Sequence, residues 1–277
     1  MNIGLLHPGA MGSSVGDALV ACGHQVGWCS AGRSAASSSR AAQFIELREL
    51  SEMTGWADVI VSICPPESAL QVAHQVQAAD FSGQYVDANA VAPATARQMA
   101  QHFAQRYVDG GLIGPPARQP GTTRLYLSGP AAADIAALFS AGYLEAVVVD
   151  QDIDSASALK MAYAAYTKGA SALLLAVNAL AKANGVHRQL QQEWAISQPN
   201  LVQRSDHTAA GVAPKAWRFA GEMAEIADTF AEQDLPDGFH RAAQQLYTTL
   251  AGLKDQQDVN LQAVLDLLVP DSPTSHR

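Results

Sequence analysis

The chain begins MNIGLLHPGAMGSSVG, Met1–Gly16, which reads as a strand followed at once by a tight turn and a helix. Residues 1–6 are apolar and unbroken, as in a parallel strand that is buried on both faces. The turn that follows is His7-Pro8-Gly9-Ala10-Met11-Gly12. We predict a helix over Met11–Cys22 and a second strand over Gln25–Cys29, so the first thirty or so residues form a βαβ unit.

The small residues of this turn are typical of a phosphate-binding loop. Gly9 lets the backbone approach a pyrophosphate, Gly12 lets the helix pack closely on the strand, and the N–H groups at the helix start face the anion. We therefore predict dinucleotide contacts from Gly9, Ala10, Met11 and Gly12. His7 stands at the first glycine of the GxGxxG pattern, so an ordinary strand–turn–helix remains the alternative.

The residues after the second strand indicate which dinucleotide binds. An acidic side chain there would bind the ribose 2′-hydroxyl, but the sequence instead offers Ser30, Arg33 and Ser34. A guanidinium and two hydroxyls can bind a 2′-phosphate, so we predict NADP(H) as the cofactor rather than NAD. A solvated polar turn with an exposed arginine is the alternative.

The composition excludes several classes of function. A chain of 277 residues with 48% hydrophobic residues can form one large or two moderate domains. Its net charge of −9 argues against binding nucleic acid or an anionic membrane. Cys22, Cys29 and Cys64 lack CxxC spacing, so we expect neither a metal site nor disulfides and favour the reducing cytoplasm. We expect no leader peptide, and the most apolar helix, Gly169–Ala181, is too short to span a bilayer.

Further strand–helix units follow the first one. Asp58–Cys64 is an apolar strand that stops at Pro65-Pro66, and Gln84–Ala88 is a strand that stops at Asn89. Such strand ends lie at the edge of a parallel sheet where ligands bind. The other predicted elements of this half are the strands Phe44–Leu47, Tyr107–Ile113, Arg124–Ser128 and Ala146–Val149 and the helices Ala94–Gln105 and Ala131–Ala141.

Strand patterns stop near Asp150. Asp154 can cap a helix that runs to about Asn184, and the later predicted helices are Leu190–Ile196, Ala216–Glu232, Gly238–Leu253 and Asn260–Leu268. We therefore predict an α/β Rossmann domain with a mostly parallel, doubly wound sheet at residues 1–150. An all-α domain follows at 151–277, and its last residues, 270–277, are expected to fray.

The long predicted helix carries the candidate for proton transfer. Lys160, Ala164 and Thr167 share one helical face, with Tyr163 beside it. A lysine among alanines and serines is poorly solvated, so Lys160 should exchange protons near neutral pH. A surface lysine that extends its amine into water is the alternative. Lys168 is about 12 Å further along the helix, too far to serve the same substrate atom.

These residues together resemble the β-hydroxyacid dehydrogenases, which include the 3-hydroxyisobutyrate and 6-phosphogluconate dehydrogenases. The turn at residues 7–12 is similar to the family's GxGxMG motif, and Cys64-Pro65-Pro66 is similar to its second cofactor loop. Residues 87–93 resemble its DxSTxxP segment, and residues 109–114 resemble its substrate-binding DAPVSGG motif. Lys160 stands where the family has its catalytic lysine.

The resemblance implies hydride transfer between nicotinamide and a small hydroxyacid or alcohol, or its carbonyl form, with Lys160 as general acid/base. Decarboxylation can follow where the substrate has a carboxylate β to the new carbonyl. The implied cofactor contacts are Cys64, Pro65, Pro66 and Asn89, and the implied substrate contacts are Asn89, Gly110, Gly111 and Gly114. The resemblance also implies a homodimer, which the apolar stretch Ala170–Ala181 favours independently.

Some positions depart from the family pattern. Ala164 replaces a substrate-binding asparagine, and Thr167 replaces the glutamate of the phosphogluconate dehydrogenases. Tyr163, Thr167 and Lys168 are therefore candidate substrate contacts. The C-terminal half resembles a branch with a C-terminal domain of unknown function. Two alternatives stay open: an imine reductase, which Ala164 would suit but Lys160 disfavours, and a non-catalytic NADP-binding sensor.

Overall fold

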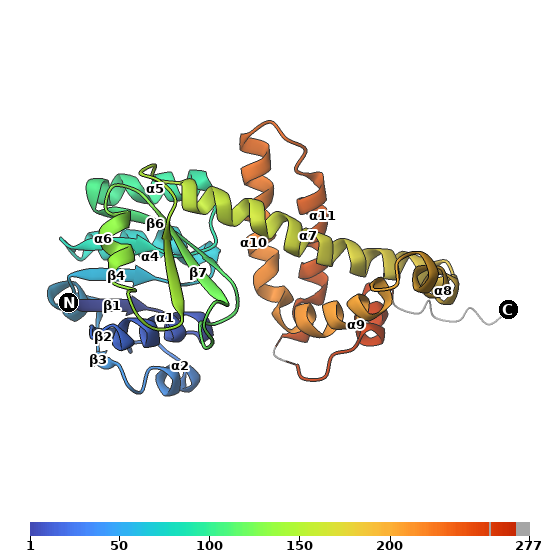
Figure 1. Ribbon diagram of the computed structural model, residues 1–277, viewed down its shortest axis with the longest axis horizontal. Coiled ribbons are helices and arrows are strands. Elements are labelled where there is room, and N and C mark those ends of the chain that lie inside the picture. Colours follow the sequence, from blue (N-terminus) through green and yellow to red (C-terminus); the bar gives the residue numbers. More distant parts are fainter. Residues whose placement is uncertain (255, 270–277) are drawn as a thin grey trace. The chain divides into compact units, whose positions relative to one another are not determined.

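The computed structural model describes residues 1–254 and 256–269, which form two units (Figure 1). The first unit comprises Met1–Met161, and the second begins at Ala162. Helix α7, Ser155–Ala183, begins in the first unit and continues without a break into the second. The segment 270–277, which was expected to fray, lies outside the described residues.

The first unit is built on one eight-stranded sheet in the order β3-β2-β1-β4-β5-β6-β7-β8. Strands β1 to β6 are parallel, β7 runs antiparallel to β6, and β8 is parallel to β7. The strands are β1 Asn2–Leu6, β2 Gln25–Cys29, β3 Ile45–Leu47, β4 Val59–Ser62, β5 Gln84–Asp87, β6 Tyr107–Ile113, β7 Thr123–Ser128 and β8 Leu144–Val148. The strand order reverses between β1 and β4, and open α/β sheets bind ligands at such a reversal.

Helices cover both faces of this sheet, because successive strand residues point to opposite sides. Ile3 and Leu5 of β1 belong to one buried core together with Leu19 of α1, whereas Leu6 belongs to a second core with Val72 of α4. The helical segments of this unit are α1 Ala10–Ala21, α2 Ala35–Arg40, α3 Leu50–Trp56, α4 Pro66–Ala78, α5 Pro93–Phe103, η1 Ala104–Arg106 and α6 Ala132–Ala137. The predicted doubly wound α/β fold is confirmed.

The second unit is helical throughout its described residues. After α7 it comprises α8 His187–Ser197, α9 Leu201–Val212, η2 Ala213–Lys215, α10 Ala216–Glu232, α11 Gly238–Thr249, η3 Leu250–Leu253 and α12 Leu261–Leu268. Helices α2, α3 and α9 were not predicted, because their short polar or alanine-rich sequences lack a clear apolar period. Within the described ranges, no helix is long and apolar enough to cross a membrane.

The start of α7 corrects one detail of the sequence analysis. Asp154 precedes the helix as predicted, and its backbone oxygen accepts a hydrogen bond from Ala158 N. Its carboxylate, however, forms an ion pair with Arg97 of α5. The first amides of α7 are instead bound by side chains from two strands, which are described below.

Candidate functional site

The turn after β1 has the geometry of a phosphate-binding loop. His7 adopts a positive φ of 69°, and its carbonyl oxygen accepts a hydrogen bond of 2.7 Å from Gly9 N. A β-carbon on Gly12 would lie 2.5 Å from this oxygen, so only glycine lets α1 start so close to the strand. No atom lies within 4 Å of a β-carbon built on Gly9, which leaves open space beside the N-terminus of α1. Ala10 and Met11 form the first turn of that helix.

The segment after β2 contains a cation, Arg33, whose charge acts on the turn. The Arg33 cation helps lower the pKa of His7 to about 4, although burial of the imidazole is the larger cause. Arg33 N donates to the carbonyl oxygen of Ser30 at 3.1 Å. Ser34 caps α2, because its hydroxyl oxygen accepts a hydrogen bond from Ser37 N. The structure thus brings Arg33 to the turn and gives the Ser34 hydroxyl a structural role.

The ends of β4 and β5 are joined by the side chain of Asn89. Its Oδ1 accepts a hydrogen bond of 2.5 Å from Cys64 N, and its Nδ2 donates to Ser62 Oγ and to Asp87. Asn89 is buried, so this amide holds the two loops in register. Pro65 and Pro66 then begin α4 as the N-cap and first helical residue. Burial and, secondarily, the charge of Asp87 raise the pKa of the Cys64 thiol to about 12, which keeps it protonated.

A buried carboxylate on β6 holds the start of α7. Asp109 accepts hydrogen bonds from Ser157 N at 2.7 Å and from Ser157 Oγ at 2.6 Å. Ser128 Oγ of β7 accepts a bond of 2.9 Å from Ala156 N. Burial raises the pKa of Asp109 to about 7 despite these donors. The sequence analysis named Asp109 only as part of the segment 109–114 and did not predict its bond to Ser157 or the role of Ser128, although a lone acid inside an apolar strand was a usable signal.

This anchor places Lys160 against β6. Lys160 Nζ donates a hydrogen bond of 2.7 Å to the carbonyl oxygen of Leu112. A β-carbon on Gly111 would lie 2.7 Å from Ala156 O and 3.1 Å from Lys160 Cβ, so the glycine allows the helix to lie on the strand. Lys160 is partly exposed, and its amine is directed to the strand end rather than into bulk water.

The glycines predicted to contact the substrate, Gly110, Gly111 and Gly114, lie on or directly after β6. Gly110 and Gly111 pair with Leu127 and Tyr126 of β7, and Gly114 follows the strand with a positive φ of 123°. A β-carbon on Gly110 would lie 2.8 Å from Asp87 O. Close packing therefore accounts for glycine at these positions, and their contact with a substrate stays a prediction.

The later candidates on α7 have partners within the helical unit. Lys168 forms an ion pair with Glu222 of α10, and its amine lies 4.8 Å from the centre of the Phe219 ring. Thr167 Oγ1 donates to the carbonyl oxygen of Tyr163 at 3.2 Å, while the Tyr163 side chain is 48% exposed. Ala164 is buried. Lys168 is thus committed to the packing of this unit, and substrate contacts by Tyr163 and Thr167 stay predictions.

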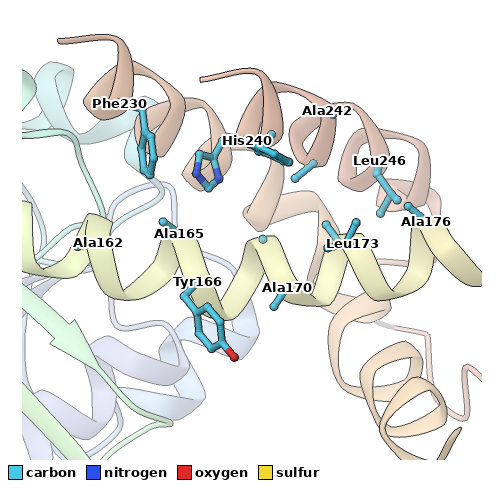
Figure 2. Close-up of a pocket in the computed structure, with 14 residues that line it drawn as sticks. Ala162, Ala165, Tyr166, Ala170, Leu173, Ala176, Phe230, His240, Ala242 and Leu246 are labelled. Atoms are coloured by element: carbon cyan, nitrogen blue, oxygen red, sulfur yellow. The ribbon is translucent and has the colours of Figure 1, made fainter. Parts of the chain in front are cut away.

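The helical unit also contains an apolar cavity of about 580 Å³ (Figure 2). Its walls come from α7, α10 and α11, and Leu173 of α7 lies on the side of that helix towards Leu246, whereas the Tyr166 ring points away from α10 and α11. His240 lines it beside Phe230, with ring centres 4.4 Å apart, and burial lowers the pKa of its imidazole. No cluster of three or more potential metal ligands occurs among the described residues.

Two comparisons with known sequences each match part of this chain. Residues 181–250 match a family described as a domain of unknown function, DUF1932. An uncharacterized 28.5 kDa protein of Methanothermus fervidus is 31% identical over 135 residues. That alignment covers 48% of this chain and 52% of the relative, so it spans about half the length of each.

Two solved structures share the fold over nearly the whole chain. The first is a 3-hydroxyisobutyrate dehydrogenase of Mycobacterium tuberculosis, with 17% identity and a TM-score of 0.67, covering 96% of this chain and 98% of that one. The second is a reductive aminase of Aspergillus terreus in complex with NADPH, with 16% identity and a TM-score of 0.55, covering 97% and 99%. The predicted resemblance is confirmed at the level of the fold: the chain has the fold of the 3-hydroxyisobutyrate dehydrogenases, and residues 181–250 of its helical unit match DUF1932.

Proposed function

We propose that this protein is an NADP(H)-dependent oxidoreductase that transfers a hydride between nicotinamide and a small hydroxyacid or alcohol, or the corresponding carbonyl compound. The observation that carries the proposal is the position of Lys160. Its amine lies 2.7 Å from the Leu112 carbonyl oxygen at the end of β6, in the same sheet unit as the turn at residues 7–12. A proton-transfer group and a dinucleotide turn are the two parts that such a reaction needs.

The residues of the turn fit a dinucleotide. The open space beside Gly9 and the N-terminus of α1 suit a pyrophosphate, and the loop Cys64–Pro66 at the β4 end would flank the nicotinamide half. Ser30 and Arg33 would bind the 2′-phosphate, with Ser34 as a further hydroxyl at the start of α2. When bound, the nicotinamide supplies the acceptor or donor of the hydride.

Lys160 moves the proton that accompanies the hydride. In its neutral form the amine accepts the hydroxyl proton of an alcohol, and in its charged form it returns a proton to the carbonyl oxygen. The Leu112 carbonyl orients the amine through its hydrogen bond, and Gly110 and Gly111 lie on the same strand, which Gly114 follows. Where a carboxylate stands β to the new carbonyl, loss of CO₂ needs no further protein group.

Reduction of a C=N bond is the second candidate. The shared fold with a reductive aminase that binds NADPH favours it, as does the small buried Ala164 on the helix that carries Lys160. An iminium substrate needs no general base to remove a hydroxyl proton. Activity with cyclic imines that is independent of Lys160 would therefore distinguish this reaction from alcohol oxidation.

We also propose that the protein is a homodimer of the reducing cytoplasm, with free thiols at Cys22, Cys29 and Cys64. Tyr166, Leu173 and Leu180 recur every seven residues along α7 and are 72%, 60% and 65% exposed. An apolar stripe of this kind needs a protein surface to cover it. Light scattering should give twice the chain mass, and Leu173→Asp should yield the monomer, while Ile196→Asp, at an exposed apolar residue of α8, should not.

Thermal shift with the two cofactors tests the central part of the proposal. Saturating NADPH should raise the melting temperature well above the value with equimolar NADH, because binding to the native state alone is stabilising. Equal shifts would refute the assignment of NADP(H). A panel of hydroxyacids, aldehydes and cyclic imines then identifies the substrate class, and NADPH binding without turnover of any member would support the sensor.

A further inference from the structure

His7 occupies a backbone conformation that costs strain. Its φ of 69° lies in the left-handed region, which glycine adopts freely and other residues rarely do. The conformation is imposed by the turn, because the His7 carbonyl oxygen is bound by Gly9 N and covered by Gly12. Strained positions of this kind are enriched at functional sites.

The side chain of His7 lies within electrostatic range of one cation, Arg33. Within residues 1–254 and 256–269, His7 Nδ1 and Arg33 Nε are both buried and lack a hydrogen-bond partner. Arg33 is the charged group that acts on His7, whereas the acids Asp87 and Glu67 act on Cys64, whose thiol also feels Arg33. Burial and the Arg33 charge keep the pKa of His7 at about 4, so its imidazole is neutral at physiological pH.

We propose that His7 binds the 2′-phosphate of NADP(H) together with Arg33 and takes up one proton from solvent when this phosphate binds. The inference rests on the proposed function. A dianion beside both groups compensates Arg33 and favours the imidazolium form of His7. The protonated ring then donates a charge-assisted hydrogen bond to a phosphate oxygen. The neutral imidazole avoids a second uncompensated cation in the nucleotide-free protein, and the bound imidazolium adds to the preference for NADP(H) over NAD(H).

The expected signature is a proton linkage. Over the pH range between the His7 pKa values without and with nucleotide, the association constant for NADPH should rise by up to about tenfold for each unit that pH falls. The 2′-phosphate itself titrates near pH 6 and acts in the opposite direction. Variants without the imidazole measure the proton exchange that comes from the 2′-phosphate alone. His7→Gly restores the usual turn residue, and His7→Asn keeps a polar side chain that tolerates positive φ.

Calorimetric titration in two buffers of different ionisation enthalpy measures the protons exchanged on binding. At pH 6.5 we expect the wild type to take up about one proton more than either variant with NADPH, and no such difference with NADH. In addition, NADPH should shift the ¹⁵N resonances of His7 to those of an imidazolium.

Three other outcomes of these titrations would refute either this inference or the proposed function. Tight NADPH binding with equal proton exchange in wild type and variants would overturn the inference and leave the proposed function intact. The same difference with NADH would assign the proton to pyrophosphate binding and overturn the role at the 2′-phosphate. Failure of the wild type to bind either nucleotide would instead refute the proposed function.

Discussion

Replacement of Asp109 by asparagine should change how the stability of the protein depends on pH. Asp109 is fully buried, and burial raises its pKa from 3.8 to about 7, although Ser157 and Ser128 donate hydrogen bonds to it. The folded protein therefore binds a proton at Asp109 over a pH range in which the unfolded chain has released it. Stability from this group is complete below the unfolded pKa and is lost as pH rises through the folded pKa.

The size of the effect follows from the shift. A difference of about three pKa units corresponds to at most about 4 kcal/mol at about 1.36 kcal/mol per unit. Between pH 5 and pH 8 the loss amounts to about 2 to 3 kcal/mol, because part of it already occurs below pH 5. The lowered pKa of His7 has the opposite effect on the pH dependence. The stability that the neutral His7 contributes to the folded protein is lost as pH falls below about 6.5.

Urea unfolding of the wild type and of Asp109→Asn at pH 5 and pH 8 separates these contributions. Asparagine has nearly the volume of aspartate, and its Oδ1 can still accept a bond from Ser157, but it does not titrate. The wild type should lose about 2 to 3 kcal/mol more than the variant over this range. Parallel pH profiles, or a wild type that gains stability relative to the variant as pH rises, would refute the reasoning.

Three further predictions concern substitutions of Gly111, Arg33 and Lys168. Gly111→Ala places a β-carbon against α7 and should cost about 1 to 3 kcal/mol of unfolding free energy in urea, whereas Gly55→Ala, with open space around it, should not. Arg33→Gln should weaken NADPH binding by about tenfold or more in calorimetry and leave NADH binding unchanged. Lys168→Met leaves the carboxylate of Glu222, which is 13% exposed, without its ion pair and should cost about 3 to 5 kcal/mol, most of which the double variant with Glu222→Leu should restore.

Much of the fold was predictable because its signals are local. Unbroken apolar residues predict the strand at residues 1–6, and small residues at fixed spacing predict the turn around Gly12. The bounds of β2, β6 and α10 are those predicted, since each segment has a clear period or a clear stop signal.

The hydrogen bonds that hold the candidate site in place were not predictable, because they join residues far apart in the chain. Asp109 binds Ser157, 48 positions away, and no local pattern specifies that pair. The local rule for helix starts selected Asp154 as a capping side chain, but a tertiary partner, Arg97, binds its carboxylate. The role of Asn89, whose side chain binds Cys64 N 25 positions away, likewise depends on the folded arrangement.

The most direct test of the account is the rate of hydride transfer in Lys160→Met, measured by NADPH absorbance in a single turnover with the best substrate of the panel. Lys215→Met removes the charge of an exposed lysine in the helical unit and is the matched control. We predict that Lys160→Met binds NADPH like the wild type but transfers hydride about 10² to 10⁴ times more slowly. A wild-type rate in Lys160→Met, at saturating nucleotide and substrate, would contradict the assignment of Lys160 as the proton-transfer group.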